Sequence, residues 1–206
     1  MELVEACHAL AAAGLVVGTS GNVSVRDGDR VRLSPKGVAL GELTADDIAV
    51  VSLAGDVLAG DPTSELELHL AIYGSYDAGA IVHTHAPRTT AVACVLDELP
   101  VIHYQLLGMG GAIRVAPFAA FGTAELASAV TDALDGRRAA LLANHGAVTY
   151  GATLAEAVER AIVLEWACGV YQDAARVGTP RVLDEQQQAA VRTSAERHGY
   201  RSLLPE

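Results

Sequence analysis

Short hydrophobic runs alternate along this chain with small and polar residues, and the two patterns together predict its elements. Stretches that open on a capping residue or a proline and continue with helix-forming residues are predicted to be helices. Ser64 with Glu67, and Thr153 with Glu156, have the spacing of a capping box, and Pro87 suits the first turn of a helix. The predicted helices span residues 2–13, 64–76, 87–96, 123–134, 153–177 and 184–198.

Apolar runs bounded by glycine, proline, asparagine or aspartate are predicted to be strands. Turn residues at 27–29 and 55–56 predict hairpins, which exclude a purely parallel sheet. Residues 147–150 are predicted to continue the strand that begins at residue 138. The other strands are expected within residues 17–26 (as strand–turn–strand), 31–33, 48–53, 57–58, 79–86, 100–111 (with a glycine-rich connection) and 113–116. Strands interleaved with helices indicate an α/β sandwich with mixed strand direction.

The bulk composition limits the classes of partner. A chain of 206 residues, 51% hydrophobic, suits one globular domain over residues 1–206. The formal net charge of −11 argues against nucleic acid and anionic membranes as partners, and an anionic substrate would need a local binding device. No apolar run reaches the length of a membrane span. Cys7, Cys94 and Cys168 lie in apolar, helix-like contexts and are expected to be reduced core residues of a cytoplasmic protein.

The strand at 79–86 carries two histidines that share one face. Side chains of a strand alternate between its faces, so His83 and His85 project from the same side, a few ångströms apart. An imidazole pair on a rigid strand suits a divalent transition metal such as zinc. The alternative is that both are ordinary polar residues at a strand end, hydrogen-bonded to neighbours or water.

Other candidate ligands lie elsewhere in the chain. Glu65 and His69 are spaced i, i+4 and share a helix face, where they could instead be a solvated glutamate and a packing histidine. His145 follows an apolar strand and precedes Gly146, whose lack of a side chain allows close backbone approach; it could also be an ordinary loop histidine. With His83 and His85 it would complete a three-histidine site with one open position, as in catalytic zinc centres.

Small and hydroxyl-bearing loops offer a way to bind phosphate without net positive charge. The segments 20–22, 34–37 and 63–64 present hydroxyls or exposed backbone N–H groups. Thr63 and Ser64 also lie at the start of a helix, which is a natural anion site. Each segment alone could be an ordinary turn.

These motifs occur in an order that resembles a known family. They are Ser-Gly-Asn-Val-Ser at 20–24, Ser-Pro-Lys-Gly at 34–37, Thr-Ser-Glu at 63–65, His-Thr-His at 83–85, Ile-His-Tyr at 102–104 and Asn-His-Gly at 144–146. The ordered set is similar to the class II aldolase/adducin family, and within it to members that act on L-fuculose 1-phosphate. The resemblance implies a three-layer α/β/α sandwich with a mixed, largely antiparallel central sheet.

The resemblance also implies roles for residues. His83, His85 and His145 would bind Zn²⁺, or another divalent metal such as Mn²⁺ or Co²⁺, and Glu65 would be the acid/base and a further metal ligand. Tyr104 would donate a proton across a subunit boundary of a homotetramer with shared active sites. The substrate-binding residues would be Thr19, Gly21, Asn22, Lys36, Gly37, Thr63 and Ser64 around the phosphate, and Phe121 and Tyr200 on the aldehyde side. Lys36 departs from the small hydroxyl residue expected at its position.

The implied activity is zinc-dependent, reversible cleavage of a ketose 1-phosphate to dihydroxyacetone phosphate and an aldehyde through a metal-stabilised enediolate. A Schiff-base mechanism is disfavoured because Lys36 is the chain's one lysine and lies in a turn. Alternatives on the same scaffold are a methylthioribulose-1-phosphate dehydratase, a decarboxylase and a sugar-phosphate 4-epimerase, although the epimerases carry aspartate where Glu65 stands. A non-catalytic adducin-like scaffold is least favoured, because this chain keeps the three histidines.

Overall fold

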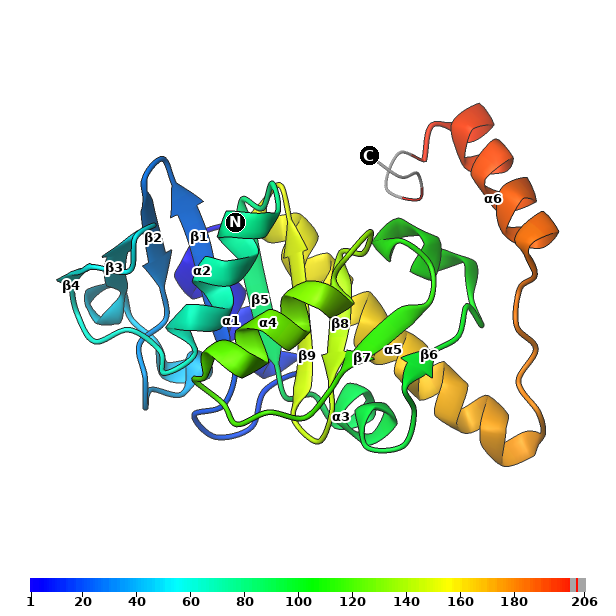
Figure 1. Cartoon of the computed structure of the whole chain (residues 1–206), viewed down its shortest axis with the longest axis horizontal. Helices are drawn as coiled ribbons and strands as arrows, with labels where there is room; N and C mark the ends of the chain where they lie inside the picture. The colour runs from blue at the N-terminus through cyan, green and yellow to red at the C-terminus, as the bar shows by residue number, and fades with distance from the viewer. Residues whose placement is uncertain (201–202, 204–206) are drawn as a thin grey trace.

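A nine-stranded sheet runs through the whole protein in the computed structural model, which describes residues 1–200 and 203 (Figure 1). The strand order is β4-β3-β2-β1-β5-β9-β8-β7-β6. Within the described residues β7 and β8 pair in parallel, and all the other pairs are antiparallel. The strands are β1 (Asn22–Asp27), β2 (Arg30–Leu33), β3 (Ala49–Ser52), β4 (Val57–Ala59), β5 (Ala80–Thr84), β6 (Glu98–Leu99), β7 (Ile113–Ala116), β8 (Ala139–Leu142) and β9 (Gly146–Gly151).

Helices cover both faces of this sheet and make three layers (Figure 1). Helices α2 and α4 pack on one face around a core that includes Ile72, Ile81 and Val130. Helices α1 and α5 close the other face, with Leu10 and Val82 in their core. The helices are α1 (Leu3–Ala12), α2 (Leu66–Ser75), α3 (Pro87–Ala93), α4 (Ala124–Ala133), α5 (Leu154–Val177) and α6 (Glu185–His198), with 3₁₀ helices η1 (Leu40–Glu42), η2 (Ala45–Asp47) and η3 (Tyr104–Met109). The predicted α/β/α sandwich with a mixed, largely antiparallel sheet is therefore confirmed, and one domain over residues 1–206 stays a prediction.

Two strand predictions were wrong because turns intervene. Residues 147–150 do not continue the strand before them: the chain reverses at residues 143–145, and β9 returns antiparallel beside β8. The apolar stretch 100–111 is not a strand but contains η3, which ends at Gly110 in a left-handed conformation. The segment 17–26, predicted as strand–turn–strand, contains a turn, but its strand follows the turn, because β1 begins only at Asn22.

Two smaller predictions also need correction. Ser64 does not cap α2, because the helix begins one residue later than its capping-box spacing requires and Glu65 is the N-cap. Cys94 is not a core residue: it is the exposed C-cap of α3, whereas Cys7 and Cys168 are buried as expected. The hydrophobic pattern around Cys94 does not show which residue becomes the exposed C-cap of the helix.

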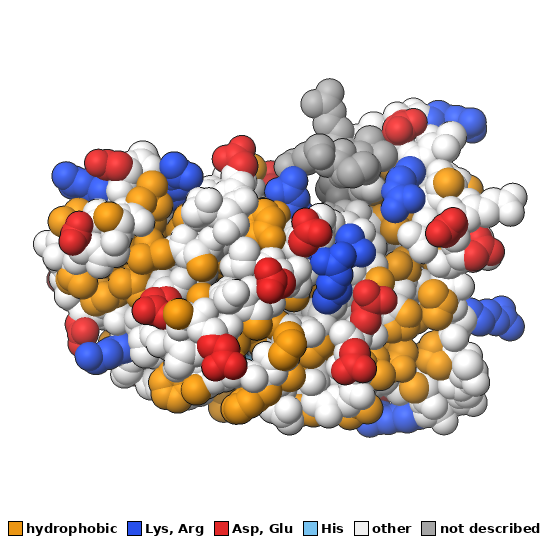
Figure 2. Space-filling view, in the orientation of Figure 1, with side chains coloured by type: hydrophobic (Ala, Val, Ile, Leu, Met, Phe, Trp, Pro, Cys, Tyr) orange, Lys and Arg blue, Asp and Glu red, His pale blue; other side chains and the backbone are white. Residues whose placement is uncertain are grey.

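Charged groups are dispersed over the face drawn in Figure 2. Acidic side chains are spread there among hydrophobic ones, and the basic side chains are scattered rather than gathered. No helix within residues 1–200 is long and apolar enough to cross a bilayer. An anionic ligand would therefore depend on a local arrangement of donors.

The middle of the sheet brings remote segments together. Strand β5 lies between β1 and β9, so Asn22 is directly opposite His83 on one side and Val148 is opposite it on the other. Strand β5 is buried along its whole length. This pairing places the end of β5, the start of β1 and the β8–β9 turn at one point, next to the start of α2.

Candidate functional site

Glu65 and three histidines meet where β5 ends. One nitrogen or carboxylate oxygen from each of Glu65, His83, His85 and His145 lies within 4.8 Å of all the others. Nε2 of His83 is 3.1 Å from Glu65 Oε2 and 2.9 Å from Nε2 of His85. Nε2 of His145 is 3.4 Å from Glu65 Oε1. The structure thus unites the four residues that the sequence nominated separately.

The β8–β9 turn explains how His145 reaches this point. Asn144 has a φ of 55°, a left-handed conformation that asparagine tolerates better than most residues. A Cβ on Gly146 would lie 2.1 Å from the carbonyl oxygen of Thr84, so only glycine lets β9 approach β5 this closely. The Asn-His-Gly sequence is therefore a turn that aims His145 at the end of β5.

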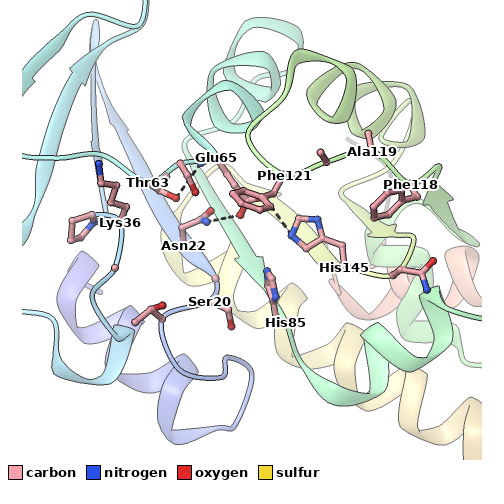
Figure 3. Close-up of a pocket in the computed structure, with 17 residues that line it drawn as sticks. Ser20, Asn22, Lys36, Thr63, Glu65, His85, Phe118, Ala119, Phe121 and His145 are labelled. Atoms are coloured by element: carbon pink, nitrogen blue, oxygen red, sulfur yellow. Dashed lines mark hydrogen bonds and ion pairs between the residues drawn. The ribbon is translucent and has the colours of Figure 1, made fainter.

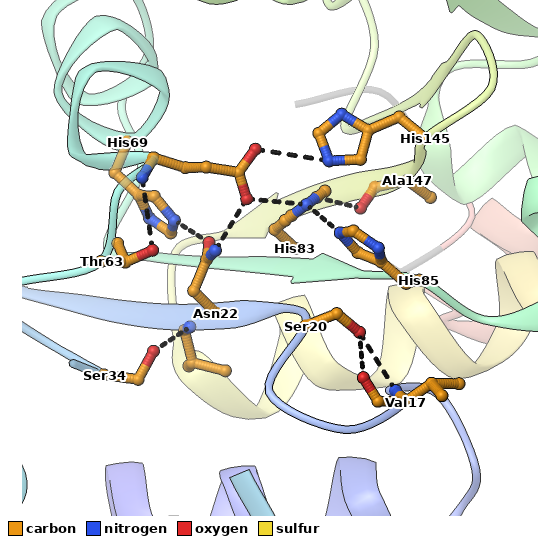
Figure 4. A network of polar contacts seen from close by, with 12 residues as sticks. Val17, Ser20, Asn22, Ser34, Thr63, His69, His83, His85, His145 and Ala147 are labelled. Carbon is orange, nitrogen blue, oxygen red and sulfur yellow. Dashed lines mark hydrogen bonds and ion pairs between the residues drawn. The ribbon is translucent and has the colours of Figure 1, made fainter. Parts of the chain in front are cut away.

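Glu65 is fixed at the start of α2 and turned inward. Its backbone N–H donates to Oγ1 of Thr63 at 3.3 Å, and its side chain is buried. Oε2 accepts a hydrogen bond from Nδ2 of Asn22 at 2.9 Å (Figure 4). Oε1 accepts no hydrogen bond from any described residue, although it is buried. Asn22 therefore holds Oε2, whereas Oε1 makes no hydrogen bond in the described part of the chain and lies 3.4 Å from Nε2 of His145.

Electrostatics keep Glu65 ionised and two of the imidazoles neutral. Burial alone would raise the pKa of Glu65, but His83 and Asn22 outweigh burial and hold that pKa well below its ordinary value. Burial and the neighbouring His83 lower the pKa of His85 to about 3 and also lower the pKa of His145. Burial acts in the same direction on His83, but Glu65 outweighs it and raises the pKa of that imidazole. Neutral imidazoles and ionised carboxylates are the forms that bind metals.

The four residues fit a divalent metal. Three imidazole nitrogens and a carboxylate are the usual donor set for zinc and its neighbours in the periodic table. Nδ1 of His83 lies 3.0 Å from the carbonyl oxygen of Ala147, which favours a proton on Nδ1 and makes Nε2, which faces the cluster, the nitrogen that would bind the ion. Oε1 of Glu65, which accepts no hydrogen bond from the described residues, is a further ligand atom for the ion. His83, His85, His145 and Glu65 would hold the ion.

An open cleft of about 630 Å³ leads to this cluster (Figure 3). One wall carries small polar residues and Lys36, and the other carries Phe118 and Phe121. The ammonium group of Lys36 is exposed and lies 3.0 Å from Asp61. The cleft is lined by Thr19, Ser20, Gly21, Asn22, Pro35, Lys36, Gly37, Thr63, Ser64, Glu65, His85, Phe118, Ala119, Ala120, Phe121, Asn144 and His145. The predicted polar loops and Phe121 therefore do line one cavity.

Tyr104 and Tyr200 lie elsewhere on this chain. Both line a second hollow of about 440 Å³ between η3 and α6, and both are exposed. The ring of Tyr104 lies 4.5 Å, centroid to centroid, from that of His103, which in turn contacts Trp166. The cleft of a single chain does not include either tyrosine among its lining residues.

Phe118 is a cleft residue that the sequence predictions missed. It is 67% exposed although it is a large aromatic side chain. The sequence did carry a signal, because Phe118 and Phe121 stand in a short segment of small residues between a strand and a capped helix. Gly122 holds this segment against the start of α2, since a Cβ there would lie 2.7 Å from the carbonyl oxygen of Ser64.

Comparison with known proteins identifies the family. Residues 1–172 match the Class II Aldolase and Adducin N-terminal domain. The 5-methylthioribulose-1-phosphate/5-deoxyribulose-1-phosphate aldolase of Rhodospirillum rubrum is 35% identical, with 98% of this chain and 93% of that protein aligned. The L-fuculose phosphate aldolase of Escherichia coli K12 is also 35% identical, over 97% of this chain and 95% of that one. The chain therefore belongs to the class II aldolase and adducin family.

A solved structure agrees with this assignment. An L-fuculose 1-phosphate aldolase superposes with a TM-score of 0.89 at 34% identity, covering 96% of this chain and 94% of that one. The protein is accordingly a class II aldolase, a metal-dependent carbon–carbon lyase. Both the resemblance and the enzyme class expected from the sequence motifs are confirmed.

Proposed function

We propose that this protein reversibly cleaves a ketose 1-phosphate to dihydroxyacetone phosphate and an aldehyde, with zinc as its metal. The observation that carries the proposal is the buried Glu65 carboxylate, which lies among His83, His85 and His145 at the end of a polar cleft. Mn²⁺ or Co²⁺ could take the same ligands. The free cysteines suit a reducing, cytoplasmic location, which is part of the same proposal.

Glu65 supplies the proton transfer at carbon. When the C3–C4 bond breaks, C4 becomes the aldehyde carbon and the electron pair stays on C3. In the synthetic direction the ionised Glu65 removes a proton from C3, and in the cleavage direction the protonated form of Glu65 returns that proton to C3. Oε1, which accepts no hydrogen bond from the described residues, is suited to hold it. A bound divalent cation would supply Lewis-acid stabilisation of the negative charge that develops on the substrate oxygens.

The phosphate group is assigned to the polar wall of the cleft. Ser64 is exposed directly before α2, where backbone N–H groups and the helix dipole favour an anion. Thr63, Gly21 and Gly37 line the same wall. Lys36 can add a positive charge if its ammonium group leaves Asp61 for the ligand. Thr19 and Asn22 complete the proposed substrate-binding set, and Phe121 lines the opposite, aldehyde side.

Tyr104 is assigned the role of donating a proton to the aldehyde oxygen in the synthetic direction. This role requires a second subunit. It lines the hollow at η3 and α6 rather than the cleft of its own chain. A cyclic homotetramer with shared sites would bring the neighbour's Tyr104 and Tyr200 to each cleft. The exposed aromatic side chains Tyr104 and Trp166 suit a buried contact between subunits.

The proposal is tested by product analysis with three substrates. Zinc-loaded protein is incubated with L-fuculose, 5-deoxyribulose and 5-methylthioribulose 1-phosphates, and dihydroxyacetone phosphate is measured through NADH oxidation by a coupling dehydrogenase. Release from at least one is expected, with inorganic phosphate competing. The unphosphorylated ketoses are the matched control and should react at least tenfold more slowly, because the phosphate contacts are lost.

Other products would redirect the assignment. Loss of water from 5-methylthioribulose 1-phosphate without dihydroxyacetone phosphate would favour the dehydratase, and loss of CO₂ from an acid phosphate would favour the decarboxylase. Equal rates on phosphorylated and free ketoses would overturn the phosphate assignment. In Ser64→Ala, KM should rise about tenfold with little change in kcat, because one phosphate donor is removed.

A further inference from the structure

A buried series of hydrogen bonds lies behind Glu65, on the side away from the cleft. The hydroxyl of Tyr73 is 2.8 Å from Oγ of Ser24, and that oxygen is 2.6 Å from Nδ1 of His69. Nε2 of His69 is hydrogen-bonded to Oδ1 of Asn22, whose Nδ2 donates to Glu65 Oε2 (Figure 4). All five side chains are buried, and His69 is fully so.

The direction of every bond in this series follows from its last member. An ionised carboxylate only accepts hydrogen bonds, so the amide nitrogen of Asn22 must face Glu65 and its oxygen must face His69. His69 must then donate from Nε2. Its two ring nitrogens face a hydroxyl and an amide, which carry no charge, so a fully buried imidazole is neutral here and accepts at Nδ1. Ser24 therefore donates to His69 and accepts from Tyr73.

We infer that His69 is a positioning residue for the acid/base: its Nε2–H selects the orientation of the Asn22 amide, which holds Oε2 of Glu65, so that Oε1, which accepts no hydrogen bond from the described residues, carries the substrate proton. The inference rests on the proposed function of Glu65. An Asn22 amide turned by half a rotation would direct its oxygen at the carboxylate, and two acceptors would then face each other in a buried place. Within the described residues, His69 is the partner of Oδ1 that prevents this rotation.

The hydrogen bond that Nδ1 of His69 accepts from Ser24 has its own role. It fixes which nitrogen of His69 carries the proton, because the Ser24 hydroxyl already supplies the hydrogen of that bond. A histidine in the other tautomer would offer a lone pair to Asn22 and favour the wrong amide orientation. Tyr73 completes the series but does not touch the bond between His69 and Asn22.

Two substitutions at one position separate positioning from packing. In His69→Gln the amide nitrogen can occupy the place of Nε2 and donate to Asn22, whereas in His69→Asn the shorter side chain can reach Ser24 but not Asn22. We expect kcat for dihydroxyacetone phosphate release to fall about tenfold to a hundredfold in His69→Asn, the range found for residues that orient catalytic groups, and less than about fivefold in His69→Gln. KM should change less than kcat in both. Tyr73→Phe is the control for loss of a buried hydrogen bond alone.

The tautomer gives a readout that does not depend on turnover. Nitrogen-15 NMR of the folded protein should show the His69 ring protonated at Nε2 and unprotonated at Nδ1, with the signals assigned by their absence in His69→Gln. The opposite tautomer would overturn the inference. Two kinetic results, measured against an active wild-type enzyme, would also overturn it. One is an equal loss of kcat in His69→Asn and His69→Gln, and the other is a loss of kcat in Tyr73→Phe as large as that in His69→Asn. A wild type that releases no dihydroxyacetone phosphate would instead count against the proposed function, while the tautomer would still test the hydrogen-bond directions.

Discussion

Single residues decide the chemistry of this cleft through what surrounds them. Glutamate is common at the start of a helix, but Glu65 is only 5% exposed and one of its carboxylate oxygens makes no hydrogen bond with another described residue. Sequence spacing showed that Glu65 and His69 share a side of α2. It could not show that Asn22, from strand β1, is hydrogen-bonded to both side chains, because that contact depends on the β1–β5 register.

Replacing Glu65 by glutamine should remove the acid/base and little else. Glu65→Gln keeps the shape of the side chain but cannot take up a proton, so kcat should fall about a hundredfold or more. The folded state should persist by circular dichroism and the metal should still bind to the three histidines. Glu67→Gln, an exposed neighbour on the same helix, is the matched control and should turn over normally. Near-normal turnover in Glu65→Gln would reduce this residue to an N-cap.

The three cysteines should differ sharply in reactivity. Burial raises the pKa of the Cys7 thiol to about 12 and raises that of Cys168 further, so neither forms thiolate at neutral pH. Cys94 is exposed and should be the one thiol that reacts quickly with Ellman's reagent in native protein. Cys94→Ser should abolish the fast phase, and three fast thiols would contradict the described burial.

Local elements were predictable where the sequence contains its own boundary signals. Thr123, Thr153 and Asp184 all cap the helices that follow them, as their residue types indicated. The stretch 100–111 has no such signal, and its apolar residues serve a 3₁₀ helix as well as a strand. The turn between β8 and β9 was missed because the residues before Asn144 and after Gly146 are both apolar, so the two strands were interpreted as one.

The β8–β9 turn should not tolerate a side chain at its last residue. Gly146→Ala places a Cβ 2.1 Å from the Thr84 carbonyl, so β9 must move away from β5. We expect the free energy of unfolding to fall by about 2 kcal/mol, the usual cost of overpacking, and metal affinity to fall because His145 moves with the turn. Urea unfolding and metal titration measure the two effects.

Gly74→Ala supplies the control for this substitution. Gly74 lies within α2, and an added Cβ there meets nothing within 4 Å. Alanine in a helix should stabilise the protein by about 0.5–1 kcal/mol and leave metal binding unchanged. Equal stability changes in Gly146→Ala and Gly74→Ala would contradict the close approach of β5 and β9.

At the scale of the whole molecule, one chain provides only part of the proposed site. The cleft is lined by Glu65, His85, His145 and the proposed phosphate loops, whereas Tyr104 and Tyr200 line a separate hollow. The prediction that Tyr104 acts in a neighbouring subunit's site came from the family resemblance. The hydrophobic pattern and residue spacing of one chain do not show where a second copy binds.

Subunit mixing tests the shared site. Tyr104→Phe and Glu65→Gln should each be nearly inactive alone. Mixed tetramers should regain part of the activity, because some clefts combine an intact Glu65 with an intact Tyr104 from the next subunit. Unmixed samples of each variant, taken through the same exchange conditions, are the controls. Verified mixed tetramers without activity, or a fully active monomer, would refute the arrangement.

The metal content of the purified protein tests the central claim most directly. If Glu65, His83, His85 and His145 form a metal centre, inductively coupled plasma mass spectrometry should find about one divalent ion per subunit of wild-type protein. His83→Ala/His85→Ala should hold almost none after equal exposure to zinc, because two of the three imidazole donors are gone. His8→Ala/His198→Ala, which removes two histidines outside the cluster, should keep full occupancy. Full occupancy in His83→Ala/His85→Ala would contradict the account.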